Sequence, residues 1–167
     1  MKSILLIIAT ALFGTTFAKE TVQPIEEVQM NYPYVSLGLG PAPIPLPVFG
    51  AGYRLQRGHH GFDTSIEGAT VWEASAVKGS VLYNYYFTPN PCRQDYIGFG
   101  PSVGVGFARY HRSKVAGAAE FTFGKQYITD TGATRFFQAD IDFPVIVGNK
   151  FHTYAIPILV LKYGIGF

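Results

Sequence analysis

The last eleven residues of the chain, from Pro157 to Phe167, alternate between bulky apolar side chains and other residues. In a β-strand successive side chains point to opposite faces, so a period of two places one set on one face. The pattern predicts a terminal strand with one apolar side. Counted back from the C-terminus, the apolar positions are Phe167, Ile165, Tyr163, Leu161 and Leu159.

The same alternation recurs along the chain, and Pro, Gly, Asn and Asp residues separate one alternating segment from the next. Evenly spaced strands with turn residues between them are typical of an all-β barrel. We therefore predict a single antiparallel up-and-down transmembrane β-barrel of about eight strands over residues 33–167. The expected strands are 34–40, 48–56, 62–72, 77–88, 96–110, 115–127, 135–147 and 153–167.

The N-terminal segment has the three parts of a secretory signal peptide. Lys2 supplies the basic start, an apolar run follows from Ile4 to Gly14, and Ala18 ends a small-residue cleavage site. We predict a signal peptide over residues 1–18 and a flexible periplasmic lead over residues 19–32. No later segment holds 18 consecutive apolar residues, so we expect no helical membrane anchor.

The terminal Phe167 and the spacing Lys162-x-Gly164-x-x-Phe167 resemble the C-terminal signature of bacterial outer-membrane β-barrel proteins. The resemblance implies export to the outer membrane of a Gram-negative bacterium and contact with its lipid and lipopolysaccharide. It also implies that the barrel-assembly machinery recognises the last strand, and that the N-terminus lies in the periplasm. The exterior connections are then 41–47, 73–76, 111–114 and 148–152, which are short and argue against an adhesin.

Alternation alone does not say which face of the sheet points outward. A membrane barrel places its apolar face toward lipid, whereas a soluble lipocalin-like carrier, which we keep as an alternative, places it inward. Charged residues make up only 14% of the chain against a typical value of about 25%, which favours the membrane barrel. Charges on the apolar face fall near strand ends, as do many aromatics that we interpret as interfacial girdles. The charges are Arg109, Lys125 and Arg135, and the aromatics are Tyr32, Tyr34, Phe87, Tyr96, Tyr127, Phe136, Phe151 and Tyr154.

The opposite face carries charges of both signs, which can neutralise one another inside a narrow lumen. Eight strands leave an interior that side chains fill or that holds one small ligand, so we expect no wide pore. A hairpin near residue 150 would place Lys162 beside Asp140 or Asp142, and we predict an ion pair there. The predicted lumenal polar network is Arg54, Asp63, Glu67, Lys78, Glu120, Asp140, Asp142 and Lys162.

One set of residues suggests an enzyme. His111-x-Ser113 followed by Glu120 resembles the His-x-Ser plus Glu arrangement of outer-membrane lipid A deacylases, in which a base and an orienting acid activate a serine. The resemblance covers these three residues, with Lys114 where that family has Asn. A polar turn at the barrel rim is the alternative interpretation.

The remaining candidates give weak indications of chemistry. His59 and His60 are adjacent on a turn and have no evident third ligand, so we predict neither a metal nor a cofactor. Cys92, the single cysteine, is either a free thiol or an intermolecular disulfide. A net charge of +2 without a basic stripe does not indicate nucleic acid. The sequence favours a structural or membrane-organising barrel, with the deacylase and the lipocalin-like carrier as alternatives.

Overall fold

The computed structural model describes residues 28–40, 45–71, 74–88, 90, 92–108, 111–129, 131–147, 150–151 and 157–167. Nine strands lie within these ranges, eight long ones and one of two residues. Their bounds are β1 Gln29–Gly40, β2 Leu46–Arg57, β3 His60–Val71, β4 Ala74–Tyr86, β5 Arg93–Ala108, β6 His111–Ile128, β7 Thr134–Val147, β8 Lys150–Phe151 and β9 Ile158–Gly166. The predicted signal peptide, residues 1–18, lies outside the described residues.

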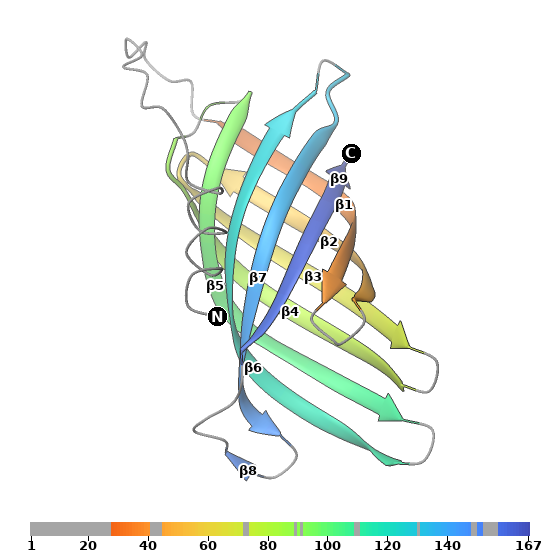
Figure 1. Ribbon diagram of the computed structural model, residues 1–167. Coiled ribbons are helices and arrows are strands. Elements are labelled where there is room, and N and C mark those ends of the chain that lie inside the picture. The colour runs from red at the N-terminus through yellow and green to blue at the C-terminus, as the bar shows by residue number, and fades with distance from the viewer. Residues whose placement is uncertain are drawn as a thin grey trace, which may run out of the picture.

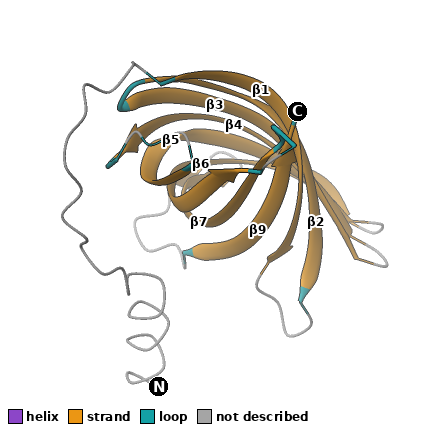
Figure 2. Ribbon diagram, turned by 90° about the horizontal axis from the view of Figure 1, so that it is seen from above, coloured by secondary structure: helices purple, strands orange, loops and turns teal. Residues whose placement is uncertain are grey.

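The eight long strands form one closed antiparallel barrel (Figures 1 and 2). Each strand from β1 to β7 pairs with its neighbour in the chain, while β8 pairs only with the end of β7. Closure comes from β9, which pairs with β7 along one edge and with β1 along the other. No helix in the described ranges is long and apolar enough to cross a membrane.

The two faces of the sheet differ as a period of two requires. On β1, Val35, Leu37 and Leu39 point outward and are 51%, 54% and 55% exposed. Similar residues on the other strands extend this apolar surface around the barrel, and aromatic rings contact edge to face across it. One such row is Phe62, Tyr83 and Phe99, with ring centroids 5.7 and 5.8 Å apart. An outer wall of this kind is suited to lipid.

We call the end of the barrel that holds Gln29 and the C-terminus the termini end, and the other the far end. Tight turns join strands at the termini end. Gly58 follows β2 with φ of 55°, a conformation that glycine adopts without a steric cost, and its N–H donates to the carbonyl of Val28. Gly132, with φ of 82°, serves the same purpose between β6 and β7.

The structure corrects several predicted strand bounds. Strand β1 begins at Gln29, so the predicted lead of residues 19–32 is wrong at its end; residues 19–27 lie outside the described residues. The predicted rim turn 111–114 is wrong because β6 already begins at His111. Of the predicted last strand, residues 153–156 lie outside the described residues, and β9 spans Ile158–Gly166. The cause is the same for β1 and β6, since polar residues at a strand end lack the alternation that reveals a strand.

The girdle interpretation is wrong for four aromatics, because Tyr32, Tyr34, Tyr96 and Phe136 point into the barrel and are buried. Phe87 and Tyr127 face outward at the termini end. Of the charges on the outer face, Lys125 pairs with Asp95 at 3.3 Å near the end of β6, and Arg135 is exposed near the start of β7. Arg109, Tyr154 and the side chain of Phe151 lie outside the description.

The polar lumen as the candidate functional site

The inward face of the barrel is filled by polar and charged side chains. All eight residues of the predicted lumenal network point inward, and seven of them are buried; Lys78 is the exception, with 19% of its side chain exposed. Together with neighbouring aromatic and glutamine side chains on the inward face, these residues form two groups. The arginine cluster consists of Arg54, Asp63, Tyr32, Tyr34, Tyr96, Phe136, Gln56, Gln94, Gln126 and Gln138, and the acidic-lysine cluster consists of Glu67, Lys78, Glu120, Asp140, Asp142 and Lys162.

Arg54 is the centre of the arginine cluster and is fully buried. Its Nε donates to Asp63 Oδ2 at 2.8 Å, and its Nη2 donates to the same oxygen and to Gln138 Oε1 at 2.9 Å. Its Nη1 donates to Tyr96 Oη at 3.0 Å and to Gln126 Oε1 at 3.2 Å. Every one of the five guanidinium N–H groups therefore has an acceptor, the condition under which a buried charge is tolerated.

Aromatic rings pack around this guanidinium. Its Cζ lies 4.7 Å from the ring centroids of both Tyr96 and Phe136, and 5.5 Å from that of Tyr34. The Tyr34 hydroxyl also donates to Asp63 Oδ1 at 2.7 Å. Cation–π contacts gain strength where water is excluded, so rings and hydrogen bonds together hold the cluster in place.

Glycines on neighbouring strands make room for these rings. A Cβ at Gly164 would lie 2.0 Å from the ring of Phe136, and a Cβ at Gly124 would lie 2.2 Å from that of Tyr96. The rings thus cover backbone that carries no side chain, and the termini half of the lumen is filled.

The acidic-lysine cluster joins carboxylates from different strands through two ammonium groups. Lys78 Nζ on β4 lies 3.0 Å from Asp142 Oδ2, 3.1 Å from Glu120 Oε2 and 3.5 Å from Glu67 Oε2. Lys162 Nζ on β9 pairs with Asp140, one of the two expected partners, and with Glu67 across the lumen. Gln138 links the two clusters by donating to Asp140 Oδ1 at 2.8 Å.

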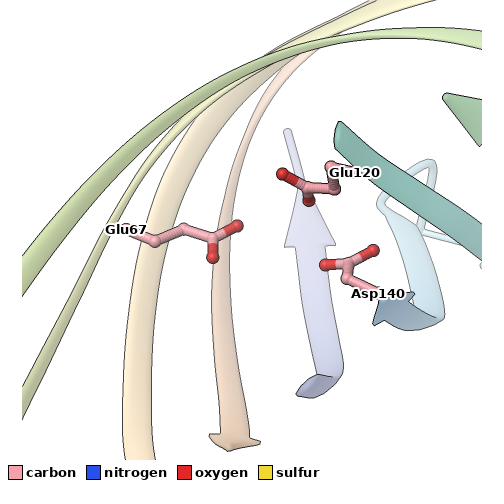
Figure 3. Close-up of side chains that lie close together, drawn as sticks. All are labelled: Glu67, Glu120 and Asp140. Carbon is pink, nitrogen blue, oxygen red and sulfur yellow. The ribbon is translucent and has the colours of Figure 1, made fainter. Parts of the chain in front are cut away.

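Glu67, Glu120 and Asp140 form a group of three carboxylates among the described residues of the lumen. One oxygen from each lies within 4.8 Å of the others, and all three side chains are buried. Figure 3 shows the three carboxylates turned toward a shared space from β3, β6 and β7. Carboxylate oxygens are ligands for hard cations, and in this group the ammonium groups of Lys78 and Lys162 already contact all three carboxylates.

The residues that suggested a deacylase do not come together. Ser113 and Glu120 lie on the same strand, β6, seven residues apart, which corresponds to roughly 23 Å at about 3.3 Å per residue. Ser113 is exposed near the far end, whereas Glu120 is buried in the acidic-lysine cluster. A serine, a base and an orienting acid must be within hydrogen-bond reach, so these residues cannot form that catalytic unit. The side chain of His111 lies outside the description.

The other predicted positions are distributed over the outer wall. Leu159, Leu161, Tyr163 and Ile165 lie on the outward face of β9, and Phe167 is 73% exposed, with its N–H donating to the carbonyl of Pro33 at 3.0 Å. His59 lies in the turn after β2 and His60 begins β3; both are exposed, and His60 Nδ1 lies 2.5 Å from the Tyr83 hydroxyl. Cys92 is exposed near the start of β5.

Sequence reasoning missed the aromatic and glutamine part of the arginine cluster. Tyr32, Tyr34, Tyr96 and Phe136 have the same strand parity as the inward charges of their strands or neighbours, and parity was the signal that could have found them. Gln56, Gln94 and Gln126 share that parity, and the Gln126 amide donates to both of the others at 2.8 and 2.7 Å.

An antiparallel barrel of eight long strands with an apolar outer wall and a polar, filled lumen defines the class of small outer-membrane β-barrels. The lipocalin-like alternative is wrong, because it requires an apolar lining and the described lumen is polar. No protein-family model matches the sequence, and no curated protein matches it.

Solved structures of the same class do match the chain. The N-terminal β-barrel domain of Pseudomonas aeruginosa OprF is 13% identical with a TM-score of 0.59, and the match covers 84% of this chain and all of that domain. Neisserial surface protein A is 8% identical, with a TM-score of 0.58 over 81% of this chain and 94% of its own. Ail of Yersinia pestis, in complex with the heparin analogue sucrose octasulfate, is 12% identical, with a TM-score of 0.58 over 85% of this chain and 98% of its own. At these identities the likeness concerns the fold alone.

Proposed function

We propose that this chain is an integral outer-membrane β-barrel protein of a Gram-negative bacterium with a structural or membrane-organising role, and that it is not a wide pore. The observation that carries the proposal is the arginine cluster. Arg54 and the rings around it fill the termini half of the lumen, and their hydrogen bonds hold them there. A barrel filled in this way offers lipid an outer wall and offers solutes no wide passage.

The proposal also fixes an orientation. In this class the N-terminus lies in the periplasm, so the termini end would be periplasmic and the far end exterior. Residues 1–18 would direct export, and the outward face of β9 with Phe167 would be the segment that the barrel-assembly machinery binds. The partners of the folded barrel would be membrane lipid and lipopolysaccharide, both held by the apolar outer wall.

Cell fractionation combined with gel mobility tests the location. We expect the protein in the outer-membrane fraction, with a mobility that changes on boiling because the folded barrel resists the detergent until heated. Recovery in the soluble periplasm, with the same mobility before and after boiling, would contradict the proposal.

Planar-bilayer conductance tests the role of the filled lumen. We expect the purified barrel to give no sustained conductance of the size that porins show. An Arg54→Ala, Phe136→Ala double variant removes two large side chains of the arginine cluster and is expected to raise ion leakage. Phe137→Ala, on the outward face of β7 beside Phe136, serves as the matched control. A wild-type barrel with a stable, large conductance would refute the exclusion of a wide pore.

A further inference from the structure

Three cationic side chains gather on the outer wall at the termini end, on the neighbouring strands β5, β6 and β7 (Figure 1). The strand registers place Arg93, Tyr127 and Arg135 side by side in one outward row, and Asp95 and Lys125 in the next row toward the far end. Arg93, Tyr127 and Arg135 are exposed, and Lys125 has 33% of its side chain exposed. We call these five residues the basic rows.

The basic rows carry an excess of positive charge. Lys125 pairs with Asp95 at 3.3 Å, whereas Arg93 and Arg135 form no ion pair with any carboxylate of the described residues. Neighbouring strands lie about 4.8 Å apart, so the two arginines extend from backbone positions about 10 Å apart, on either side of Tyr127. An arginine binds phosphate through paired N–H donors, and the Tyr127 hydroxyl is a further donor between the two arginines. The basic rows are therefore suited to a phosphate group.

The same three strands carry an apolar groove further along the outer wall. Pro101 and Ala119 lie directly opposite each other and form its floor, between the larger side chains of neighbouring positions. On β7 the register to β6 shifts and leaves Val145 without a partner on β6, and a bulge of this kind bends the strand locally. The groove has a volume of 480 Å³, and the outward side chains that line it are Phe99, Pro101, Val103, Ala119, Phe121 and Val145.

The distance from the basic rows to the groove matches the depth of one membrane leaflet. Ala119 and Lys125 are six residues apart on β6, which corresponds to about 20 Å at about 3.3 Å per residue. Strands of membrane barrels tilt by roughly 40°, so this corresponds to about 15 Å along the membrane normal. The hydrocarbon core is about 30 Å thick, and one leaflet is about half of that. A lipid with its headgroup at the basic rows would therefore end its acyl chains at the groove.

We propose that this face of β5, β6 and β7 binds an anionic phospholipid of the periplasmic leaflet, with its phosphate between Arg93 and Arg135 and the end of an acyl chain in the groove. Basic residues at the edge of an apolar wall complement a negatively charged lipid headgroup. The wall between the two parts is apolar, since Ile97 and Phe123 lie side by side there and are 38% and 39% exposed. The inference rests on the proposed function, because it takes the apolar wall to face lipid and the termini end to face the periplasm.

Native mass spectrometry of the full mature chain, folded in a non-ionic detergent, tests the headgroup part of the site. The barrel is titrated with dioleoylphosphatidylglycerol or with dioleoylphosphatidylcholine, which share their acyl chains and differ in headgroup charge. We expect one phosphatidylglycerol to bind about tenfold more tightly than phosphatidylcholine, and Arg135→Gln to weaken the binding of phosphatidylglycerol about fivefold. Arg57→Gln removes an exposed arginine at the same end of the barrel, but from β2, and is the matched control that should bind as the wild type does. Equal affinities for the two lipids, or equal losses in the two variants, would overturn the proposal.

A second pair of variants tests the groove. Ala119→Phe fills it, and Ala51→Phe, the matched control, adds the same bulk to the outward face of β2. We expect Ala119→Phe to weaken the binding of dioleoylphosphatidylglycerol and to leave that of dihexanoylphosphatidylglycerol unchanged, because the short chains end before the groove. Ala51→Phe is expected to leave the binding of both lipids unchanged. Unchanged binding of the long-chain lipid by Ala119→Phe, or equal losses for both lipids, would refute the groove as the acyl-chain site.

Heat-dependent gel mobility separates this inference from the proposed function. A wild-type chain that never shows a heat-dependent shift contradicts the membrane barrel itself. A wild-type barrel that folds in the outer membrane and binds both dioleoyl lipids equally refutes the lipid site and leaves the barrel standing. The comparison of the two lipids on the wild type needs no variant, so it decides the proposal even where a substitution prevents folding.

Discussion

Replacing Arg54 with Met tests whether the filled lumen depends on one buried charge. Arg54 is 0% exposed, and its five N–H groups are all used. Met fills much of the volume but leaves the carboxylate of Asp63, 2% exposed, with the Tyr34 hydroxyl as its remaining hydrogen-bond partner. Breaking a buried pair from one side costs about 3–5 kcal/mol, so we expect a loss of that size in the free energy of unfolding.

Reversible urea unfolding in lipid vesicles measures this loss, and Lys125→Met is the matched control. Lys125 also pairs with a carboxylate, that of Asp95, but the two side chains are 33% and 42% exposed. An exposed pair contributes roughly 0.2–1 kcal/mol, so the control is expected to stay within that range. If Arg54→Met lowers the free energy of unfolding no more than Lys125→Met does, Arg54 does not hold the arginine cluster together.

The double variant Arg54→Met, Asp63→Asn separates a stranded charge from lost packing. Asn keeps an oxygen for the Tyr34 hydroxyl and removes the negative charge that Arg54 had balanced. We therefore expect it to recover about 1–3 kcal/mol of the loss, the usual cost of an unsatisfied buried group. A double variant as unstable as Arg54→Met alone would show that the charge is not the cause.

Three further predictions concern the walls of the barrel. We expect Gly164→Ala to cost about 1–3 kcal/mol in urea unfolding, because its Cβ would lie 2.0 Å from the Phe136 ring, whereas Gly106→Ala, which meets no atom within 4 Å, is expected to be tolerated. Leu37→Arg on the outer face is expected to lower the free energy of unfolding in vesicles by roughly 2–4 kcal/mol, and Leu37→Ala is expected to lower it much less. Equal losses would contradict a lipid-facing wall. We expect Phe167→Ala to lower the amount of barrel assembled in cells while leaving the unfolding free energy of the refolded protein nearly unchanged, since Phe167 is 73% exposed; a normal assembled amount would refute its role in assembly.

The fold was predictable from the sequence because period-two alternation is a local property. The alternation of Val35, Leu37 and Leu39 reveals an apolar outward face from the sequence of that strand alone. A closed barrel of such strands follows because both edges of every strand must be paired. The ion pair between Lys162 and Asp140 could also be predicted from the sequence, because β7 and β9 are paired strands that lie close together in the chain.

The arrangement inside the lumen was not predictable in the same way. Arg54 and Gln138 are 84 residues apart in the chain and meet only because the barrel closes. The aromatic positions were misread for a related reason. Tyr32 and Phe136 lie near strand ends, where a ring can serve either as an interfacial anchor or as lumen filling; their strand parity points inward, and a glycine faces each ring on a neighbouring strand.

The two lumen clusters differ in how their buried charges are paired. The arginine cluster pairs one buried cation with one buried carboxylate and uses every guanidinium donor, while the amide nitrogen of Gln94 has no partner among the described atoms. The acidic-lysine cluster has more carboxylates than ammonium groups and has unpartnered neighbours at Glu120 and Thr122. A buried charge whose donors are all used holds the groups around it in one arrangement. Stability variants should therefore act most strongly through Arg54.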